Sequence, residues 1–128
     1  MAEAKRYFTL EQANTAVALI RPILREMLEI RQRIIDLQPE VWPVIEKVIG
    51  NGGNQAASQA TREFERINDL AHEIQALGGI IKDLNNGLVD FLALREGREV
   101  YLCWKYDEHH VAFWHEIEAG FDGRQLWE

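Results

Sequence analysis

The sequence predicts an α+β fold, in which a long antiparallel helical hairpin packs on a small four-stranded antiparallel β-meander. Apolar side chains in residues 9–78 recur at alternating steps of three and four, which is the period of a helix. Residues 79–128 instead alternate apolar and polar side chains between short turns, as paired strands do. We expect a single domain over residues 1–128, with the hairpin at 9–78 and the meander and tail at 79–128.

The first helix has clear start and stop signals. Thr9 and Gln12 form a capping box, in which each side chain satisfies a free backbone amide of the first turn. A continuous apolar stripe then runs from Leu10 to Leu37. Pro22 removes one helical hydrogen bond and should bend the helix, but the stripe continues in phase beyond it. Pro39 marks the end.

A second long helix should pack against the first. Residues 40–49 predict a short helix with Pro43 in its first turn, and the Gly- and Asn-rich residues 50–54 predict a joint. The second long helix follows to Leu77 and stops at Gly78. Two helices alone cannot bury both stripes, so the sheet or a second subunit must cover the remainder. We therefore expect a homodimer.

The strands are expected at residues 80–83, 88–94, 99–106 and 111–117. Asn86-Gly87 is a strong hairpin-turn signal between the first two. Short turns favour pairing of consecutive strands. We expect an irregular tail over residues 118–128, which contain two glycines.

Composition narrows the functional classes. The 128 residues carry a formal charge of −7, and the acidic excess lies entirely in residues 51–128, which hold seven basic and fourteen acidic side chains. Such a surface disfavours nucleic acid and attracts a divalent cation or a basic partner. The chain shows no signal peptide, and no apolar run approaches the roughly 18 residues of a membrane span. We expect a cytoplasmic protein that does not enter a membrane.

Several blocks of the sequence are shared with a known family. These blocks are residues 6–14, 87–91, 97–105, 113–116 and 120–125, with the sequences RYFTLEQAN, GLVDF, GREVYLCWK, FWHE and GFDGRQ. The chain resembles the small prokaryotic family called domain of unknown function 2203 over essentially its whole length. That family has no established activity, so the resemblance implies relatives and no function.

A buried carboxylate is the strongest chemical signal. Asp90 lies mid-strand among apolar neighbours, where an unpaired charge is costly, so it needs a partner. In one interpretation Asp90, His115 and Arg124 form a structural cluster that pins the tail to the sheet. In the other, Asp90, His115 and Glu116 form a ligand or metal pocket. Because adjacent strand residues point to opposite faces, His115 and Glu116 converge only at a bulge or a strand end.

The candidate ligand-binding residues are Asp90, Tyr101, Trp104, Trp114, His115, Glu116 and Arg124. Asp90, His115 and Glu116 are the candidate ligands of a divalent metal. The single cysteine, Cys103, excludes an intramolecular disulfide, and we interpret it as a small buried hydrophobe because its surroundings are acidic and no base adjoins it.

Three functional hypotheses follow. The first is a non-catalytic binding or interaction module that holds a protein partner or small ligand with its acidic, aromatic C-terminal half. The second is a metal-binding protein or metal-dependent enzyme with a His/carboxylate site. The third is a structural role in assembly through the helical hairpin. No complete catalytic constellation is present, so no catalytic residue is assigned.

Overall fold

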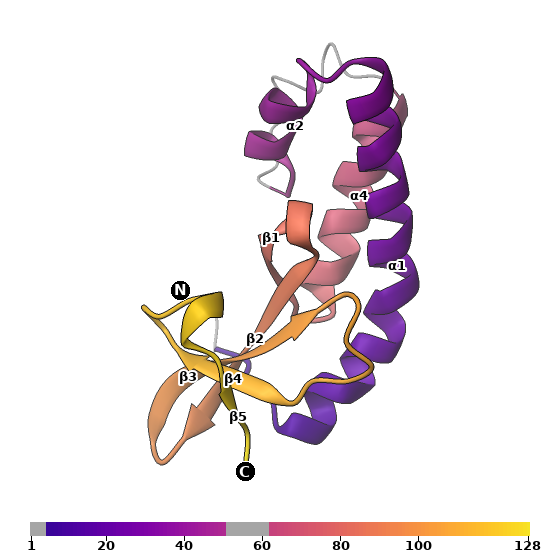
Figure 1. The fold of residues 1–128 in the computed structure, drawn as a ribbon. Coiled ribbons are helices and arrows are strands. Elements are labelled where there is room, and N and C mark those ends of the chain that lie inside the picture. Colours follow the sequence, from indigo (N-terminus) through magenta and orange to yellow (C-terminus); the bar gives the residue numbers. More distant parts are fainter. Residues whose placement is uncertain (1–4, 51–61) are drawn as a thin grey trace.

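The computed structural model describes residues 5–50 and 62–128, and it has α+β architecture as predicted. Three helices in these ranges, α1 (Leu10–Leu37), α2 (Trp42–Val48) and α4 (Arg62–Ala76), precede the sheet. The long helices α1 and α4 lie side by side (Figure 1). Because α2 lies between them in the chain, they do not form a simple two-helix hairpin. Most of the predicted joint, residues 51–54, and the predicted helix start before residue 62 lie outside the described residues.

The predicted boundaries of α1 are confirmed. The Gln12 amide donates to Thr9 Oγ1 at 3.1 Å and the Thr9 amide donates to Gln12 Oε1 at 3.0 Å, so both halves of the capping box are present. The helix then continues through Pro22 to Leu37. Gly78 follows α4 with a φ of 94°, a left-handed conformation that glycine adopts without steric cost.

The sheet has five antiparallel strands, and not the four that were predicted. They are β1 (Ile80–Asp83), β2 (Leu88–Arg95), β3 (Arg98–Lys105), β4 (Phe113–Glu116) and β5 (Gln125–Leu126), paired in chain order. The tail is therefore partly ordered, because a 3₁₀ turn, η2 (Phe121–Gly123), brings β5 back against β4. A strand of two residues is too short to show alternation in the sequence.

The turn between β1 and β2 is longer than a two-residue hairpin turn. A 3₁₀ turn, η1 (Leu84–Asn86), leads into Gly87, whose φ is 65°. The pairing register shifts between Ile81 and Asp83, which indicates a bulge in β1. The Asn-Gly signal therefore marked the correct position but not the turn type.

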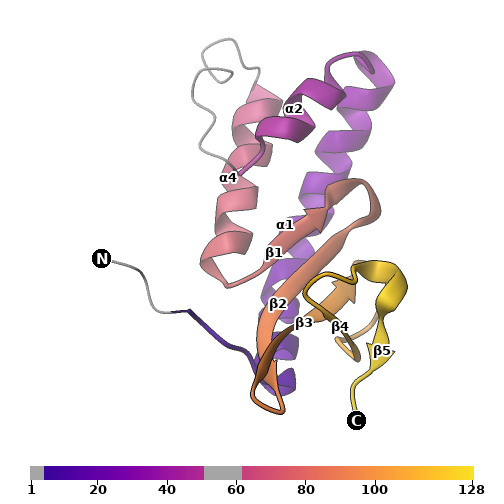
Figure 2. The ribbon, with the colours of Figure 1, turned by 90° about the vertical axis from the view of Figure 1, so that its left-hand side faces the viewer.

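Alternate residues of the strands face two different environments. The inner face packs on the helices, and its centre consists of fully buried apolar side chains: Val89, Phe91, Ala93, Val100, Leu102 and Trp104. We call the opposite side of β1 to β4 the outer face. Figures 1 and 2 show α1 and α4 on the inner side and the C-terminal segment with η2 on the other side.

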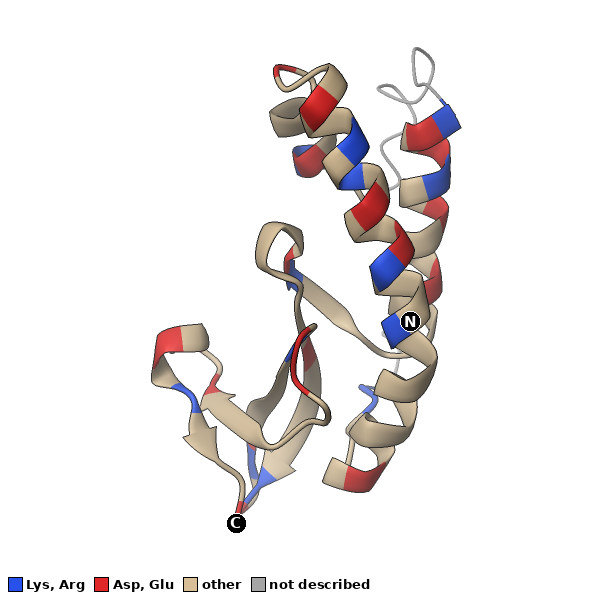
Figure 3. Ribbon diagram, turned by 45° about the vertical axis from the view of Figure 1, so that its right-hand side comes forward, with Lys and Arg blue, Asp and Glu red and all other residues tan. Residues whose placement is uncertain are grey.

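Charged residues are mixed rather than segregated on the helices. Basic and acidic residues are interspersed along α1 (Figure 3). In the described ranges, no helix combines the length and the apolar character that crossing a membrane requires.

Candidate functional site

Three neighbouring strands bring three metal-ligating side chains together on the outer face. Asp90 of β2 lies directly opposite Cys103 of β3, and His115 comes from β4. Their exposed fractions are only 1%, 1% and 3%. The His115 imidazole, the Cys103 sulfur and the Asp90 carboxylate offer ligand atoms that all lie within 4.8 Å of one another. We call these three residues the donor cluster.

Hydrogen bonds determine which imidazole nitrogen of His115 carries a proton. Nδ1 lies 2.7 Å from the backbone carbonyl oxygen of Glu116. A carbonyl oxygen only accepts, so Nδ1 must donate. Nε2 then faces Asp90 Oδ2 at 2.9 Å. Because a bare imidazole lone pair and a carboxylate repel at this distance, a proton or a cation must lie between Nε2 and Oδ2.

Burial changes the acidity of the other two members of the donor cluster. It raises the pKa of the Asp90 carboxyl, although the adjacent His115 acts in the opposite direction. Burial, followed by the negative charge of Asp90, raises the pKa of the Cys103 thiol to about 12. Without a bound cation, Cys103 is therefore a protonated thiol and a poor nucleophile.

The donor cluster fits a divalent metal chemically. Besides His115, the Asp90 carboxyl interacts with the Cys103 thiol. Its buried Oδ1 accepts no N–H or O–H hydrogen bond among the described residues, so this oxygen could bind a metal that displaces the thiol proton. Tetrahedral Zn–N and Zn–O bonds place two donor atoms about 3.3 Å apart, so Nε2 and Oδ2, now 2.9 Å apart, need to separate by only about 0.4 Å. The bond from Nδ1 to a backbone carbonyl also orients His115 as metal-ligating histidines are oriented.

A small cavity adjoins the donor cluster. Its volume is about 100 Å³ and, besides the three donors, it is lined by Lys82, Leu88, Ile117, Gly120 and Phe121. Ile117 and Phe121 are 38% and 41% exposed and form its outer rim. A group bound by the donor cluster would therefore have one side open to this cavity.

Tyr101 lies beside the donor cluster, whereas Glu116 does not. The Tyr101 and His115 rings have centroids 5.7 Å apart. The carboxylate of Glu116 pairs with Arg98 on the opposite face of the sheet, with an Oε1–Nε distance of 3.0 Å. Adjacent residues of a straight strand point to opposite faces, so His115 and Glu116 cannot share a ligand here.

Both tryptophans named from the sequence lie on the inner face. Trp104 is fully buried, and its indole nitrogen donates to the Glu108 carbonyl at 3.0 Å. Trp114 is 4% exposed and lies against the guanidinium groups of Arg95 and Arg98. Neither tryptophan walls the cavity beside the donor cluster.

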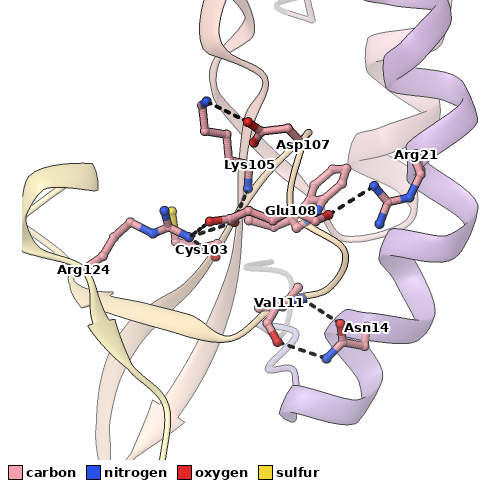
Figure 4. Close-up of polar contacts among 9 residues, drawn as sticks. Asn14, Arg21, Cys103, Lys105, Asp107, Glu108, Val111 and Arg124 are labelled. Carbon is pink, nitrogen blue, oxygen red and sulfur yellow. Dashed lines mark hydrogen bonds and ion pairs between the residues drawn. The ribbon is translucent and has the colours of Figure 1, made fainter.

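Arg124 holds the tail in place through a partner that sequence reasoning missed. Its Nη2 lies 2.6 and 2.8 Å from the two carboxylate oxygens of Glu108, and Glu108 Oε1 also accepts the Lys105 amide (Figure 4). Arg21 of α1 donates to the Glu108 carbonyl at 3.1 Å. The loop after β3 is thus tied to both α1 and the tail, next to the donor cluster rather than within it.

Cys103 is the member of the donor cluster that sequence reasoning did not assign. A signal was present, because alternation places Cys103 and Tyr101 on the same face of their strand. The register that sets Asp90 opposite Cys103 was the missing information.

A larger cavity of about 450 Å³ lies between α2, α4 and β1, lined in part by Glu46, Gln75 and Asn85. The Asn85 side chain donates to Glu46 and accepts from Arg31 and Trp42. These polar groups already satisfy one another, so this cavity carries no comparable chemical signal.

Comparison with known proteins identified one relationship. A family model described as "Uncharacterized conserved protein (DUF2203)" matches residues 6–126, nearly the whole chain, which confirms the resemblance inferred from the sequence blocks. No curated protein and no solved structure matched the chain.

Proposed function

We propose that this chain, which belongs to the DUF2203 family of uncharacterised conserved proteins, is a metal-binding protein whose ligands are Asp90, Cys103 and His115. One observation supports the proposal above all others: a carboxylate, a thiol and an imidazole meet within 4.8 Å in a buried site. The metal ligands differ from those expected from the sequence, because Cys103 takes the place of Glu116.

Zn²⁺ is the metal that this donor set suits best. A thiolate and an imidazole favour Zn²⁺ among the common divalent cations, whereas Mg²⁺ and Ca²⁺ favour oxygen ligands. The cation would replace the proton between Nε2 and Oδ2 and the proton on the thiol. Three protein ligands beside a cavity leave one coordination position open.

Two features favour metal binding over a purely structural polar cluster. A structural His115–Asp90 pair requires neither a thiol beside the carboxyl nor a second carboxyl oxygen that accepts no N–H or O–H hydrogen bond from the described residues. The tail, in turn, is held by the separate Arg124–Glu108 ion pair. Assembly through the helical stripe is also disfavoured, because Leu24 and Ile67 are fully buried within one chain.

Metal content of the untagged protein tests the proposal. We expect one Zn²⁺ per chain by elemental analysis, or one equivalent bound on titration. Co²⁺ in the same site should give thiolate-to-cobalt charge-transfer absorption, which reports Cys103 as a ligand. The near-isosteric Cys103→Ser should abolish that absorption, and Asp90→Asn should weaken Co²⁺ binding by more than about tenfold.

Two control variants separate this site from adventitious binding. Glu116→Gln removes a neighbouring carboxylate that faces the other side of the sheet, and should leave metal affinity unchanged. The double variant His109→Gln/His110→Gln removes two histidines of a loop outside the donor cluster, and should also leave metal affinity unchanged. Binding that depends on His109 and His110 but survives Cys103→Ser and Asp90→Asn would overturn the proposal.

We also propose that a second copy of the chain covers part of the outer face, as a homodimer. Ile80 and Leu94 lie on this face and are 36% and 48% exposed. The two side chains lie on the same face of the sheet, so two copies related by a two-fold axis can cover them in one apolar contact. The proposed contact is therefore on the sheet, because the helical stripes are already covered within one chain.

Analytical ultracentrifugation tests the dimer. We expect Leu94→Lys to convert dimer to monomer at micromolar concentration. Leu37→Lys is the matched control, because Leu37 is 79% exposed at the end of α1 and far from the outer face. A wild-type protein that sediments only as a monomer would rule the dimer out.

A further inference from the structure

The cavity beside the donor cluster has the size of a small ligand. Its volume of about 100 Å³ corresponds to roughly three water molecules at about 30 Å³ each. One wall is formed by the donor cluster, and the open coordination position of a bound metal would face this space. The cavity itself therefore has room for a ligand of only a few non-hydrogen atoms, and a larger ligand would extend past the exposed rim formed by Ile117 and Phe121.

The charges around the cavity select an anion. Asp90 and a Cys103 thiolate together neutralise a divalent cation. Lys82 then adds one positive charge to the cavity wall, and in the described part of the chain it forms no ion pair. Its ammonium instead lies 4.2 Å from the Tyr101 ring centroid. With metal bound the site carries a net charge of +1, which one monoanion balances.

The remaining walls favour an anion with an apolar end. Leu88, Ile117 and Phe121 contribute hydrocarbon, and among the described residues Lys82 is the one lysine or arginine that lines the cavity. A phosphate carries up to two negative charges and needs many hydrogen-bond donors, which these walls do not provide. A short-chain carboxylate has one charge and an alkyl group, and so matches both the charge and the apolar surface.

We infer that the open position of this metal site binds the carboxylate of a small monocarboxylic acid, with Lys82 as its second contact and Phe121 against its alkyl end. The inference rests on the proposed metal site. It adds the chemical class of the ligand and two residues, Lys82 and Phe121, that would contact the ligand without ligating the metal.

Co²⁺-loaded, full-length protein tests the metal site and the carboxylate ligand separately. Charge-transfer absorption before any acid is added reports the metal site alone, and its absence would count against the proposed function. Acetate, propionate and inorganic phosphate are then titrated while the d–d bands are recorded. We expect saturable changes with acetate and propionate and a much weaker response to phosphate.

Variants of the cavity wall test the residue assignments. Lys82→Met keeps the aliphatic stem, and should weaken acetate binding at least about tenfold while Co²⁺ affinity stays within about threefold. Phe121→Ala should weaken propionate more than acetate. Lys105→Met is the matched control, because Lys105 lies on the outer face beside Asp107 and does not line the cavity.

Three results would overturn the inference while leaving the metal site intact. They are d–d bands that do not respond to either acid, an equal response in Lys82→Met, and a preference for phosphate over acetate. The first would mean that water or hydroxide alone occupies the open position. Circular dichroism of each variant confirms that it is folded before its binding is compared.

Discussion

The two faces of the sheet are built from alternate residues of the same strands, yet they have opposite chemistry. On the inner face of β2, Val89 and Phe91 are completely buried against the helices. Between them, Asp90 points to the outer face and is buried just as deeply, under the C-terminal segment. Equally buried positions thus hold apolar side chains on the inner face and ionisable side chains on the outer face.

This contrast is the basis for the proposed division between a face that stabilises the fold and a face that binds a ligand. Apolar residues on the inner face gain free energy by leaving water, and their removal creates cavities. Burying Asp90 and His115 gains little, because loss of hydration offsets their mutual attraction. A cation bound as proposed would offset this loss of hydration, which apolar packing alone does not do.

The largest expected effect is on the inner face. Phe91→Ala should lower the free energy of unfolding by about 3–5 kcal/mol, because it opens a cavity in a closed core. Urea denaturation measures the change. Leu92→Ala, one residue away at a half-buried position of the outer face, should cost clearly less. Equal losses for the two variants would contradict the proposed division of the faces.

Metal binding at the donor cluster should raise the free energy of unfolding. If the proposed site is correct, Zn²⁺ at a free concentration of 100 times its dissociation constant should raise the free energy of unfolding by about 2.7 kcal/mol. The stabilisation should fall to about 1.4 kcal/mol or less in Asp90→Asn, because its metal affinity is at least about tenfold lower, and it should persist in Glu116→Gln. Thermal unfolding with and without Zn²⁺ provides the measurement, and an equal shift in both variants would count against the assignment.

Removal of one partner of the buried pair should have a smaller effect in metal-free protein. His115→Ala removes the 2.9 Å hydrogen bond between His115 Nε2 and Asp90 Oδ2 from a buried carboxyl, at a cost of about 1–3 kcal/mol. The double variant Asp90→Leu/His115→Leu should regain most of that loss, because an apolar pair replaces a desolvated polar one. The urea concentrations at the midpoint of unfolding measure these stabilities. A double variant less stable than His115→Ala would disprove the predicted recovery.

The smallest effects concern pH and should have opposite signs on the two faces. The pKa of Asp90 is raised above its ordinary value of 3.8 by burial, so the folded metal-free protein loses stability as the pH rises through that raised value. The pKa of Glu116 is lowered below 4.5 by Arg98, so its contribution is present above pH 4.5 and is lost as the pH falls.

Stability measured across acidic pH distinguishes the two groups. Asp90→Asn should remove the loss at rising pH and leave the loss at falling pH, whereas Glu116→Gln should do the reverse. The Glu116 effect should be slight, because the ion pair is half exposed and screened by water. Identical pH profiles for both variants would refute the assignment.

Sequence reasoning identified two of the three donor residues but not how they combine. Asp90 was singled out because a carboxylate between apolar neighbours needs a partner, and His115 was among the partners considered. Glu116 was included because it adjoins His115 in the chain, yet strand geometry sends it to the other face. Cys103 was interpreted as a small hydrophobe because its strand partner was unknown.

Local patterns were sufficient for the elements that depend on residues close in the chain. The capping box, the extent of α1 and the alternation of β3 follow from side chains a few positions apart, and the structure has all of them. The 3₁₀ turn before β2 and the two-residue β5 were missed, since one arises from a bulge and the other from the return of the tail.

The sequence by itself determined the class of fold, the periodicity of each long element and the need of Asp90 for a partner. Only the tertiary structure decided that this partner is His115, that Cys103 joins them and that Arg124 pairs with Glu108 instead. Periodicity is local, so it can be read along the chain. Cross-strand register depends on turn lengths and bulges, where a shift of one residue moves every side chain to the other face.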